Sequence, residues 1–316
     1  MSRIIKTLIA VPLLFVLTAA PVFAVCGDDN GGGILIAPRR QRAGEYLSKS
    51  VAHDFNRDGR MDAAVADDYS NKIFVLFGDG AGNLDLAAEY TVGAGPIDLR
   101  AADFNGDGLT DLITANRGDG SVSLLHGASG GTFSIGALSV AATAFSPAAL
   151  AVGDFNADGR QDFAASDSLS NSVLIFLNGA GGAFTAAGSV RVGANPGALV
   201  AGKFDRDRFP DLAVVNSDAN TVSILRNRFG NFSVAQEISV GASPVALESA
   251  DFNGDGRTDL ITADKYANTA TVLNGNSFGR FYFSQTLAAG QSPRSLTIGD
   301  FNRDGRMDAA VADDYS

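Results

Sequence analysis

Acidic and amide side chains recur in this sequence at a fixed spacing inside short polar stretches. In DFNGDGLTD, Asp103, Asn105, Asp107 and Asp111 occupy the first, third, fifth and ninth positions. Three carboxylates this close together repel one another unless a cation lies among them. Calcium takes about six to eight oxygen ligands at ~2.3–2.6 Å, which these side chains, a main-chain carbonyl and water would supply. The stretch therefore predicts a calcium-binding loop, in which Gly108 permits the sharp turn.

The same ligand positions occur in five loops. The predicted metal ligands are Asp54, Asn56, Asp58 and Asp62; Asp103, Asn105, Asp107 and Asp111; Asp154, Asn156, Asp158 and Asp162; Asp251, Asn253, Asp255 and Asp259; and Asp300, Asn302, Asp304 and Asp308. The alternative is a set of Asx turns that bind no metal, because Asp, Asn and Gly all favour turns. Five copies of one ligand pattern favour calcium, at up to five sites. Since the loops contain no His or Cys, zinc and copper are poor candidates.

A further loop, KFDRDRFPD, departs from this pattern. Lys203 replaces the first Asp, and Arg208 replaces the Gly. We expect the ammonium group of Lys203 to neutralise the carboxylates of Asp205, Asp207 and Asp211. The loop from Lys203 to Asp211 is therefore predicted to be metal-free.

These loops belong to a repeat of 48 to 51 residues, whose acidic stretches begin at positions 54, 103, 154, 203, 251 and 300. Around the second loop, PIDLRAA alternates apolar and polar residues as a half-buried strand does, and LITAN, SVSLLHG and GTFSIGALSV are short and rich in β-forming residues. Four short strands per repeat are typical of a β-propeller blade. No stretch shows helical periodicity, so alternating strands and helices are excluded.

Phenylalanine recurs at two places in the repeat. The second loop position is Phe55, Phe104, Phe155, Phe204, Phe252 or Phe301, and the fourth strand carries Phe133, Phe184, Phe232 or Phe281. Stacking platforms for sugars are one interpretation. One large apolar residue per blade is more typical of packing between neighbouring sheets, which we favour.

DFNGDGLTDLITAN, with the later Gly-x-x-Pro that opens the next unit, resembles the FG-GAP/VCBS repeats of integrin α-chain propellers and of many secreted bacterial proteins. The Gly-x-x-Pro segments are 93–96, 193–196, 241–244 and 290–293, and the resemblance covers roughly residues 45 to 316. It implies a calcium-bearing β-propeller. Such repeats occur in adhesins, in lectins and as accessory modules of secreted enzymes, so the resemblance alone does not assign a function.

The predicted fold is all-β, a β-propeller of about six four-stranded blades whose last blade is incomplete. The stretch DFNRDGRMDAAVADDYS occurs at 54–70 and again at 300–316, where the third strand that follows the first copy is missing. Aligning the two copies makes residues 33–44 a fourth strand. We therefore expect an N-terminal strand to complete the last blade in part, with Ile34 to Ala37 either pairing with Ala309 to Ala312 or leaving a gap. A six-bladed ring with one thin blade is the alternative.

The N-terminus has the pattern of a secretory signal peptide. Arg3 and Lys6 form a basic start, the apolar run from Leu8 to Ala20 is too short to span a bilayer, and cleavage is expected near Ala24. The predicted organisation is a signal peptide at 1–24, a flexible linker at 25–32 and a propeller at 33–316. The protein is then secreted, either extracellular or periplasmic, and has no membrane span.

The single cysteine allows no intramolecular disulfide. Cys26 follows the predicted signal peptide, which resembles the start of a bacterial lipoprotein, but Val25 stands where that motif has Gly, Ala or Ser. A lipid anchor is thus the minority interpretation of Cys26, and an unpaired thiol is the other.

The formal net charge is −11, and removal of Arg3 and Lys6 with the signal peptide makes it −13. This charge argues against nucleic acids and anionic membranes as partners and favours cations. Five calcium ions would bring the net charge to about −3.

No catalytic arrangement is visible in the sequence. His53 and His126 lie outside any Ser/His/Asp or His/Glu cluster, and most carboxylates belong to the repeated loops. Arg117 to Asp119 spells Arg-Gly-Asp, which in a Gly- and Asp-rich chain is interpreted as a turn. We therefore expect no enzyme, but a non-enzymatic binding or adhesion module for glycans or cell-surface proteins. The alternative is an accessory module or fragment of a secreted polysaccharide-degrading enzyme.

Overall fold

The computed structural model describes residues 14–17, 25–27, 33–35, 47–136 and 145–314. The chain divides into two compact units. The smaller unit is Ala20–Pro147 with Ala180–Ala183, and the larger unit is Met1–Ala19, Ala148–Gly179 and Phe184–Ser316. Among the described residues, no helix is long and apolar enough to cross a membrane.

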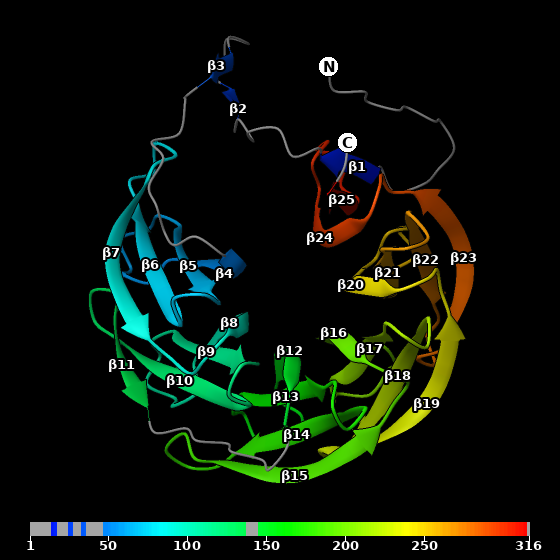
Figure 1. Ribbon diagram of the computed structural model, residues 1–316, viewed down its shortest axis with the longest axis horizontal. Coiled ribbons are helices and arrows are strands. Elements are labelled where there is room, and N and C mark those ends of the chain that lie inside the picture. The colour runs from blue at the N-terminus through cyan, green and yellow to red at the C-terminus, as the bar shows by residue number, and fades with distance from the viewer. Residues whose placement is uncertain (1–13, 18–24, 28–32, 36–46, 137–144, 315–316) are drawn as a thin grey trace. The chain divides into compact units, whose positions relative to one another are not determined.

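The described repeats form five four-stranded sheets, each with its strands side by side in chain order (Figure 1). Blade 1 is β4 (Leu47–His53), β5 (Asp62–Asp67), β6 (Lys72–Gly78) and β7 (Leu84–Thr91); blade 2 is β8 (Pro96–Ala102), β9 (Asp111–Asn116), β10 (Ser121–Ala128) and β11 (Thr132–Gly136); blade 3 is β12 (Pro147–Gly153), β13 (Asp162–Asp167), β14 (Ser172–Asn178) and β15 (Phe184–Arg191); blade 4 is β16 (Pro196–Gly202), β17 (Asp211–Asn216), β18 (Thr221–Arg228) and β19 (Asn231–Ser239); blade 5 is β20 (Pro244–Ala250), β21 (Asp259–Asp264), β22 (Thr269–Gly275) and β23 (Phe281–Ala288). The predicted all-β propeller fold with four-stranded blades is confirmed.

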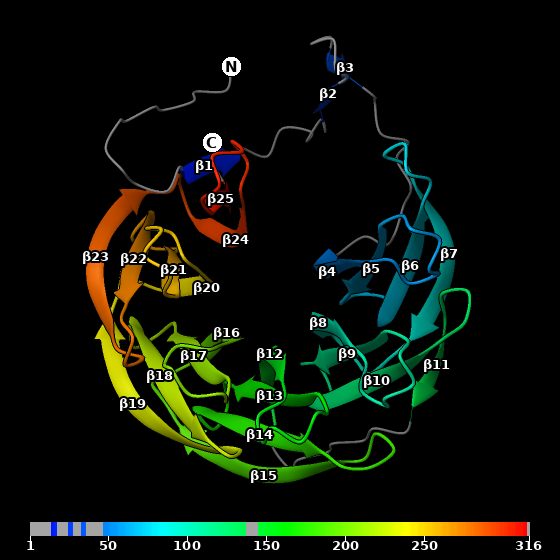
Figure 2. The same ribbon diagram turned by 180° about the vertical axis from the view of Figure 1, so that it is seen from behind.

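The last sheet is incomplete among the described residues. It contains β24 (Pro293–Gly299), β25 (Asp308–Asp313) and an N-terminal strand, β1 (Leu14–Leu17), which pairs in parallel with β25 (Figure 2). An N-terminal strand therefore contributes to the last blade, as expected, and it comes from the segment predicted to be the signal peptide.

The predicted pairing with Ala309 to Ala312 is wrong for Ile34 and Leu35, and residues 36 and 37 lie outside the described residues. Ile34 lies in β3 (Gly33–Leu35), which pairs with β2 (Val25–Gly27) and places Ile34 opposite Cys26. Ala309 to Ala312 instead lie opposite Leu14 to Leu17. The segment LFVL offers four consecutive large apolar residues, whereas the predicted segment reaches Pro38, which cannot donate to a ladder, within a few residues.

The second strand is the most deeply buried strand in blades 2 to 5. Every residue of β9, β13, β17 and β21 is buried. The fourth strands are largely exposed, with β15 as an example. Each blade is therefore held mainly through its central strands.

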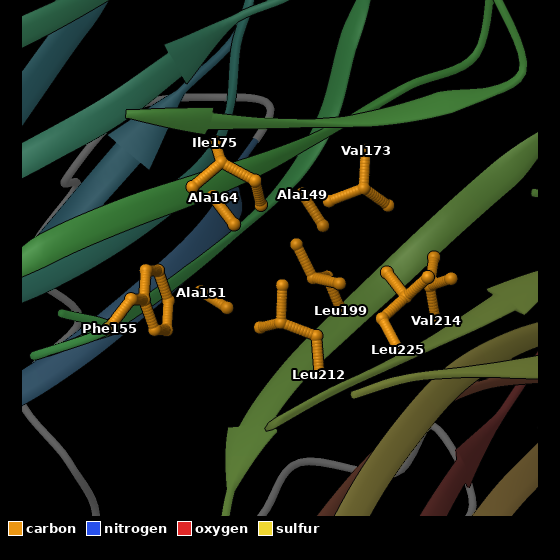
Figure 3. Packing of buried hydrophobic residues seen from close by; sticks show 10 residues of the cluster. All are labelled: Ala149, Ala151, Phe155, Ala164, Val173, Ile175, Leu199, Leu212, Val214 and Leu225. Carbon is orange, nitrogen blue, oxygen red and sulfur yellow. The ribbon is translucent and has the colours of Figure 1, made fainter. Parts of the chain in front are cut away.

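Apolar clusters fill the space between successive blades. One cluster joins residues of β12, β13 and β14 to Leu199, Leu212, Val214 and Leu225 of blade 4, and Phe155 lies at its edge (Figure 3). The recurrent phenylalanines meet across such junctions with their rings edge to face. Ring centroids are 5.6 Å apart for Phe55 and Phe133, 5.2 Å for Phe155 and Phe232, and 5.2 Å for Phe204 and Phe281. The interpretation as packing between sheets is confirmed for these six rings, whereas Phe184 contacts Phe163 of its own blade and Phe301 is exposed.

The glycine of Gly-x-x-Pro leaves no room for a side chain. A Cβ on Gly241 would lie 2.4 Å from Asp264 Oδ2, and a Cβ on Gly93 would lie 2.5 Å from Asn116 Nδ2. Both neighbours are buried, and the hydroxyl groups of Thr262, Thr269 and Thr271 hold Asp264 in place. The glycine is thus required by the close approach of a buried polar group.

We predict that Gly241→Ala destabilises the protein by about 1–3 kcal/mol, because the new methyl group overpacks a fixed site. Gly197→Ala is the matched control, since its Cβ would meet its nearest neighbours at an ordinary 3.6 Å. Urea unfolding of both variants measures the difference. Equal stability of the two variants would contradict this account.

Candidate metal-binding loops

Each acidic loop joins the first and second strands of its blade. The ninth position is the first residue of the second strand, as with Asp62 in β5 and Asp162 in β13, and it is buried in every loop. The fifth position is exposed in every loop, and the first is half-buried except at Lys203 and Asp300, which are exposed. The carboxylates of one loop therefore differ in their access to solvent.

The buried carboxylate ties the loop to the third strand. Asp162 Oδ2 accepts the N–H of Phe155 at 2.8 Å, and Oδ1 accepts the N–H of Asn178 in β14 at 2.7 Å. Asp62, Asp111 and Asp259 make the same pair of contacts in their own blades. Because an unpaired buried N–H is costly, this side chain fixes the loop where the sheet begins.

The side chains at the first and third positions converge on the main chain of the loop. Asp154 Oδ1 and Asn156 Oδ1 both accept the N–H of Asp158, each at 3.0 Å, and Asp154 Oδ2 accepts the N–H of Gly159 at 2.9 Å. Gly159 adopts a φ of 86°, which favours glycine. The contacts bring two of the predicted ligand oxygens to one point.

In the part of the chain that the structure describes, no group of three or more His, Cys, Asp or Glu side chains is gathered closely enough to hold a metal ion. The third ligand position is an amide, and the ninth carboxylate turns both oxygens toward main-chain N–H groups. The donor set of these loops, with its carboxylate and amide oxygens, nevertheless has the chemistry that a hard cation requires.

Burial makes the carboxylate of Asp162 difficult to ionise. The pKa of Asp162 is raised to about 6, mainly by burial and to a smaller extent by the carboxylates of Asp158 and Asp154, while the two N–H donors lower it. Burial likewise raises the pKa of Asp259, with a contribution from Asp255. The carboxylates of such a loop thus repel one another, and a cation among them would reduce this repulsion.

The fourth loop is organised differently from our expectation. Lys203 is exposed and has no ion pair among the described residues, whereas Arg226 Nε lies 3.3 Å from Asp205 Oδ2. The guanidinium of Arg208 lies over the rings of Phe209 and Phe229, at 5.1 and 5.7 Å from their centroids. The cation beside the fourth acidic loop is therefore Arg226, in place of the predicted Lys203.

Aligning the third strands of the repeats could have identified Arg226. It stands 23 residues after the start of its loop, where the other blades have Phe77, His126, Leu177 and Asn274. The arginine is new at this position, but it lies in the third strand, outside the loop residues that pointed to Lys203.

The remaining singled-out residues serve the fold. His53 Nε2 and Thr110 Oγ1 form a hydrogen bond of 2.7 Å, and His126 Nδ1 lies 3.7 Å from Asp111 Oδ2. In the Arg-Gly-Asp segment, Asp119 accepts the N–H of Ala94 at 2.7 Å. This carboxylate is engaged in the turn between β9 and β10, which agrees with the turn interpretation.

A family profile described as an FG-GAP-like repeat matches residues 54–114, 103–165, 154–214, 203–262 and 251–311. The chain belongs to this family. The matched segments begin at the first position of the acidic loops, so the loops are a defining part of the FG-GAP-like repeat here. The match at 203–262 includes the fourth loop despite its altered residues.

Solved structures share the fold at low identity. A putative 6-phosphogluconolactonase from Bacteroides fragilis is 16% identical, with a TM-score of 0.61 over 80% of this chain and 74% of that chain. A functionally unknown protein from Desulfotomaculum acetoxidans is 14% identical, with a TM-score of 0.58 over 76% and 70%. BBS1N, in complex with ARL6DN, is 16% identical, with a TM-score of 0.56 over 80% and 72%. No curated protein matches the sequence.

We predict that Asp211→Asn stabilises the protein at pH 8 and has little effect at pH 4. Burial raises the pKa of Asp211 to about 7, with further contributions from Asp205 and Asp207, while Arg226 lowers it. The folded state then binds more protons than the unfolded state, so stability contributed by this group below pH 4 is lost as pH rises toward 7. The neutral amide keeps an acceptor for the N–H of Asn227, which Asp211 Oδ1 accepts at 2.8 Å.

Urea unfolding between pH 4 and 8 in EDTA tests this prediction. Asp68→Asn, at an exposed position in a turn, serves as the control for the lost charge. Parallel stability curves for Asp211→Asn and the unaltered protein would exclude the titration of Asp211.

Proposed function

We propose that this FG-GAP-like repeat protein is a secreted, calcium-binding β-propeller that acts as a non-enzymatic binding or adhesion module for glycans or surface proteins. The observation that carries the proposal is the recurrence of one oxygen donor set in five loops at the same structural position, after the first strand of the blade. A hard cation is the ligand class that suits such donors.

Within a loop, Asp154, Asn156, Asp158 and Asp162 would hold the ion, and the other four loops would use their equivalent residues. The bound ion supplies positive charge among the carboxylates. The main-chain N–H groups of Asp158 and Gly159 orient the oxygens of Asp154 toward the loop. Because the ninth residue also contacts the third strand, ion binding would stiffen the blade around it.

Large side chains at the opposite end of the second strands support a binding role. The turns after β5, β13 and β21 expose Tyr69, Leu169 and Tyr266, with 74%, 61% and 75% of their surface accessible. These positions are equivalent in the repeat. Exposed apolar and aromatic residues on turns supported by a rigid sheet are typical of recognition surfaces.

An enzymatic role is the competing proposal, since one structural neighbour is a putative 6-phosphogluconolactonase. At 16% identity this likeness shows the fold alone. Hydrolysis of 6-phosphogluconolactone by the purified protein in calcium would contradict the non-enzymatic part of our proposal.

We expect calcium to raise the melting temperature of the protein above its value in EDTA. An ion that binds only the folded state stabilises it by RT ln(1 + [L]/Kd), about 2.7 kcal/mol per site at 100 Kd. Asp158→Asn should reduce this gain, whereas Asp68→Asn removes the same charge from an exposed turn and should not. Calorimetry in calcium and in EDTA decides, and identical melting temperatures in the two solutions would refute calcium binding.

We also expect the protein to bind a defined set of glycans or surface proteins on an array, and chelation to weaken that binding because the blades become less rigid. Replacing Tyr266 with Ser should reduce the signal without changing the calcium effect on melting. An array without any retained ligand, in calcium and at micromolar protein concentration, would argue against the adhesion role.

A further inference from the structure

The side chain of Arg226 joins two blades of the larger unit. Its Nε lies 3.3 Å from Asp205 Oδ2 in the fourth loop, and its Nη2 donates to the carbonyl oxygen of Phe278, in the turn that precedes β23 of blade 5. The side chains of Arg226 and Asp205 are only 28% and 14% exposed. Solvent therefore screens this ion pair less than it screens a surface pair.

The third loop position has changed together with Arg226. In the other blades this position is Asn, and in blade 3 Asn156 Nδ2 donates to Asp158 Oδ2 at 2.9 Å. Asp205 has no amide group and adds a negative charge, but its Oδ1 still accepts the N–H of Asp207 at 2.8 Å. The guanidinium of Arg226 places a positive charge beside Asp205.

Leu177 is the residue of blade 3 equivalent to Arg226, and its neighbours show what a side chain at this position contacts. A Cβ on Gly230, in the turn before the fourth strand of blade 4, would lie 3.2 Å from a methyl group of Leu177 and 3.7 Å from Cβ of Asn156. A Cβ on Gly279, in the corresponding turn of blade 5, would lie 2.7 Å from Arg226 Nη2 and 3.1 Å from Cβ of Asp205. Leu177 and Arg226 thus fill the space between a loop and the next blade, and Arg226 is the arginine at this position.

We propose that the guanidinium of Arg226 takes the place of a metal ion in the fourth loop. It neutralises Asp205 and prevents a metal ion from binding there. It also holds the junction of blades 4 and 5 together whether or not calcium is present. The inference rests on the proposed calcium loops for its comparison with the other blades. The loop itself does not fit a divalent ion, since Lys203 removes the first carboxylate and Arg208 replaces the turn glycine. The residue that stands in for the ion comes from the third strand.

The first experiment counts calcium ions per chain by equilibrium dialysis. Lys203→Asp, Asp205→Asn and Arg208→Gly together restore the ligand pattern of the other loops. With Arg226 retained, we expect the count of the unaltered protein. Adding Arg226→Leu, which introduces the residue found at this place in blade 3, should increase the count by one. A gain of one ion with Arg226 present, or no gain after its replacement, would overturn the proposal.

The second experiment needs no metal. Melting in EDTA should show a fall of several degrees for Arg226→Leu and a smaller fall for Arg226→Lys, which keeps the charge but not the forked donor geometry. Arg228→Leu, at an exposed position two residues further along β18, should melt as the unaltered protein does. Equal melting of Arg226→Leu and Arg228→Leu would overturn the structural role.

The two experiments separate this inference from the proposed function. If the unaltered protein binds no calcium, the calcium proposal fails, yet the comparison in EDTA still decides whether Arg226 holds the junction. If calcium binds but Arg226→Leu leaves melting in EDTA unchanged, only the role of Arg226 fails.

Discussion

The buried carboxylate at the ninth loop position is the constraint on which each blade depends. Asp162 accepts one N–H from its own loop and one from the third strand, so it fixes the place where the chain leaves the loop and enters the sheet. The N–H from the loop belongs to Phe155, whose ring enters the junction with blade 4 and meets Phe232. A single buried charge therefore sets the path of the loop and, through the adjacent residue, the packing between blades.

That carboxylate also creates an electrostatic cost that each blade must offset. A buried carboxylate near other carboxylates favours its protonated form, and the raised pKa of Asp162 is the result. In blade 4 a guanidinium from β18 reaches the loop and lowers the pKa of Asp211, although burial still raises it to about 7. In the other loops the proposed calcium ion would carry out this neutralisation. The repeat thus keeps one backbone geometry while the source of positive charge differs between blades.

Local pattern in the sequence predicted the strands, the blades and the packing role of most of the recurrent phenylalanines, because alternation, turn residues and one aromatic per repeat are short-range signals. It failed where a contact links residues distant in the chain. Arg226 reaches Asp205 from the third strand, so the loop composition alone pointed to Lys203. The strand beside β25 was also misassigned, since edge pairing depends on which apolar segment reaches it and the repeat alignment does not encode this. Nor could spacing show that Asp162 turns both oxygens toward the main chain.

These differences imply that the blade junctions do not respond alike to solution conditions. A carboxylate neutralised by a proton loses that stabilisation as pH rises, and one neutralised by a bound ion loses it when the ion is chelated. A guanidinium remains charged under all these conditions. The contact that Arg226 makes at the junction between blades 4 and 5 should consequently be insensitive to chelators, although the raised pKa of Asp211 still makes blade 4 sensitive to pH. The junctions around the calcium-type loops should carry most of the sensitivity to chelators. A repeat protein can in this way combine loops that respond to calcium with one that does not, by changing a few side chains on an unchanged backbone.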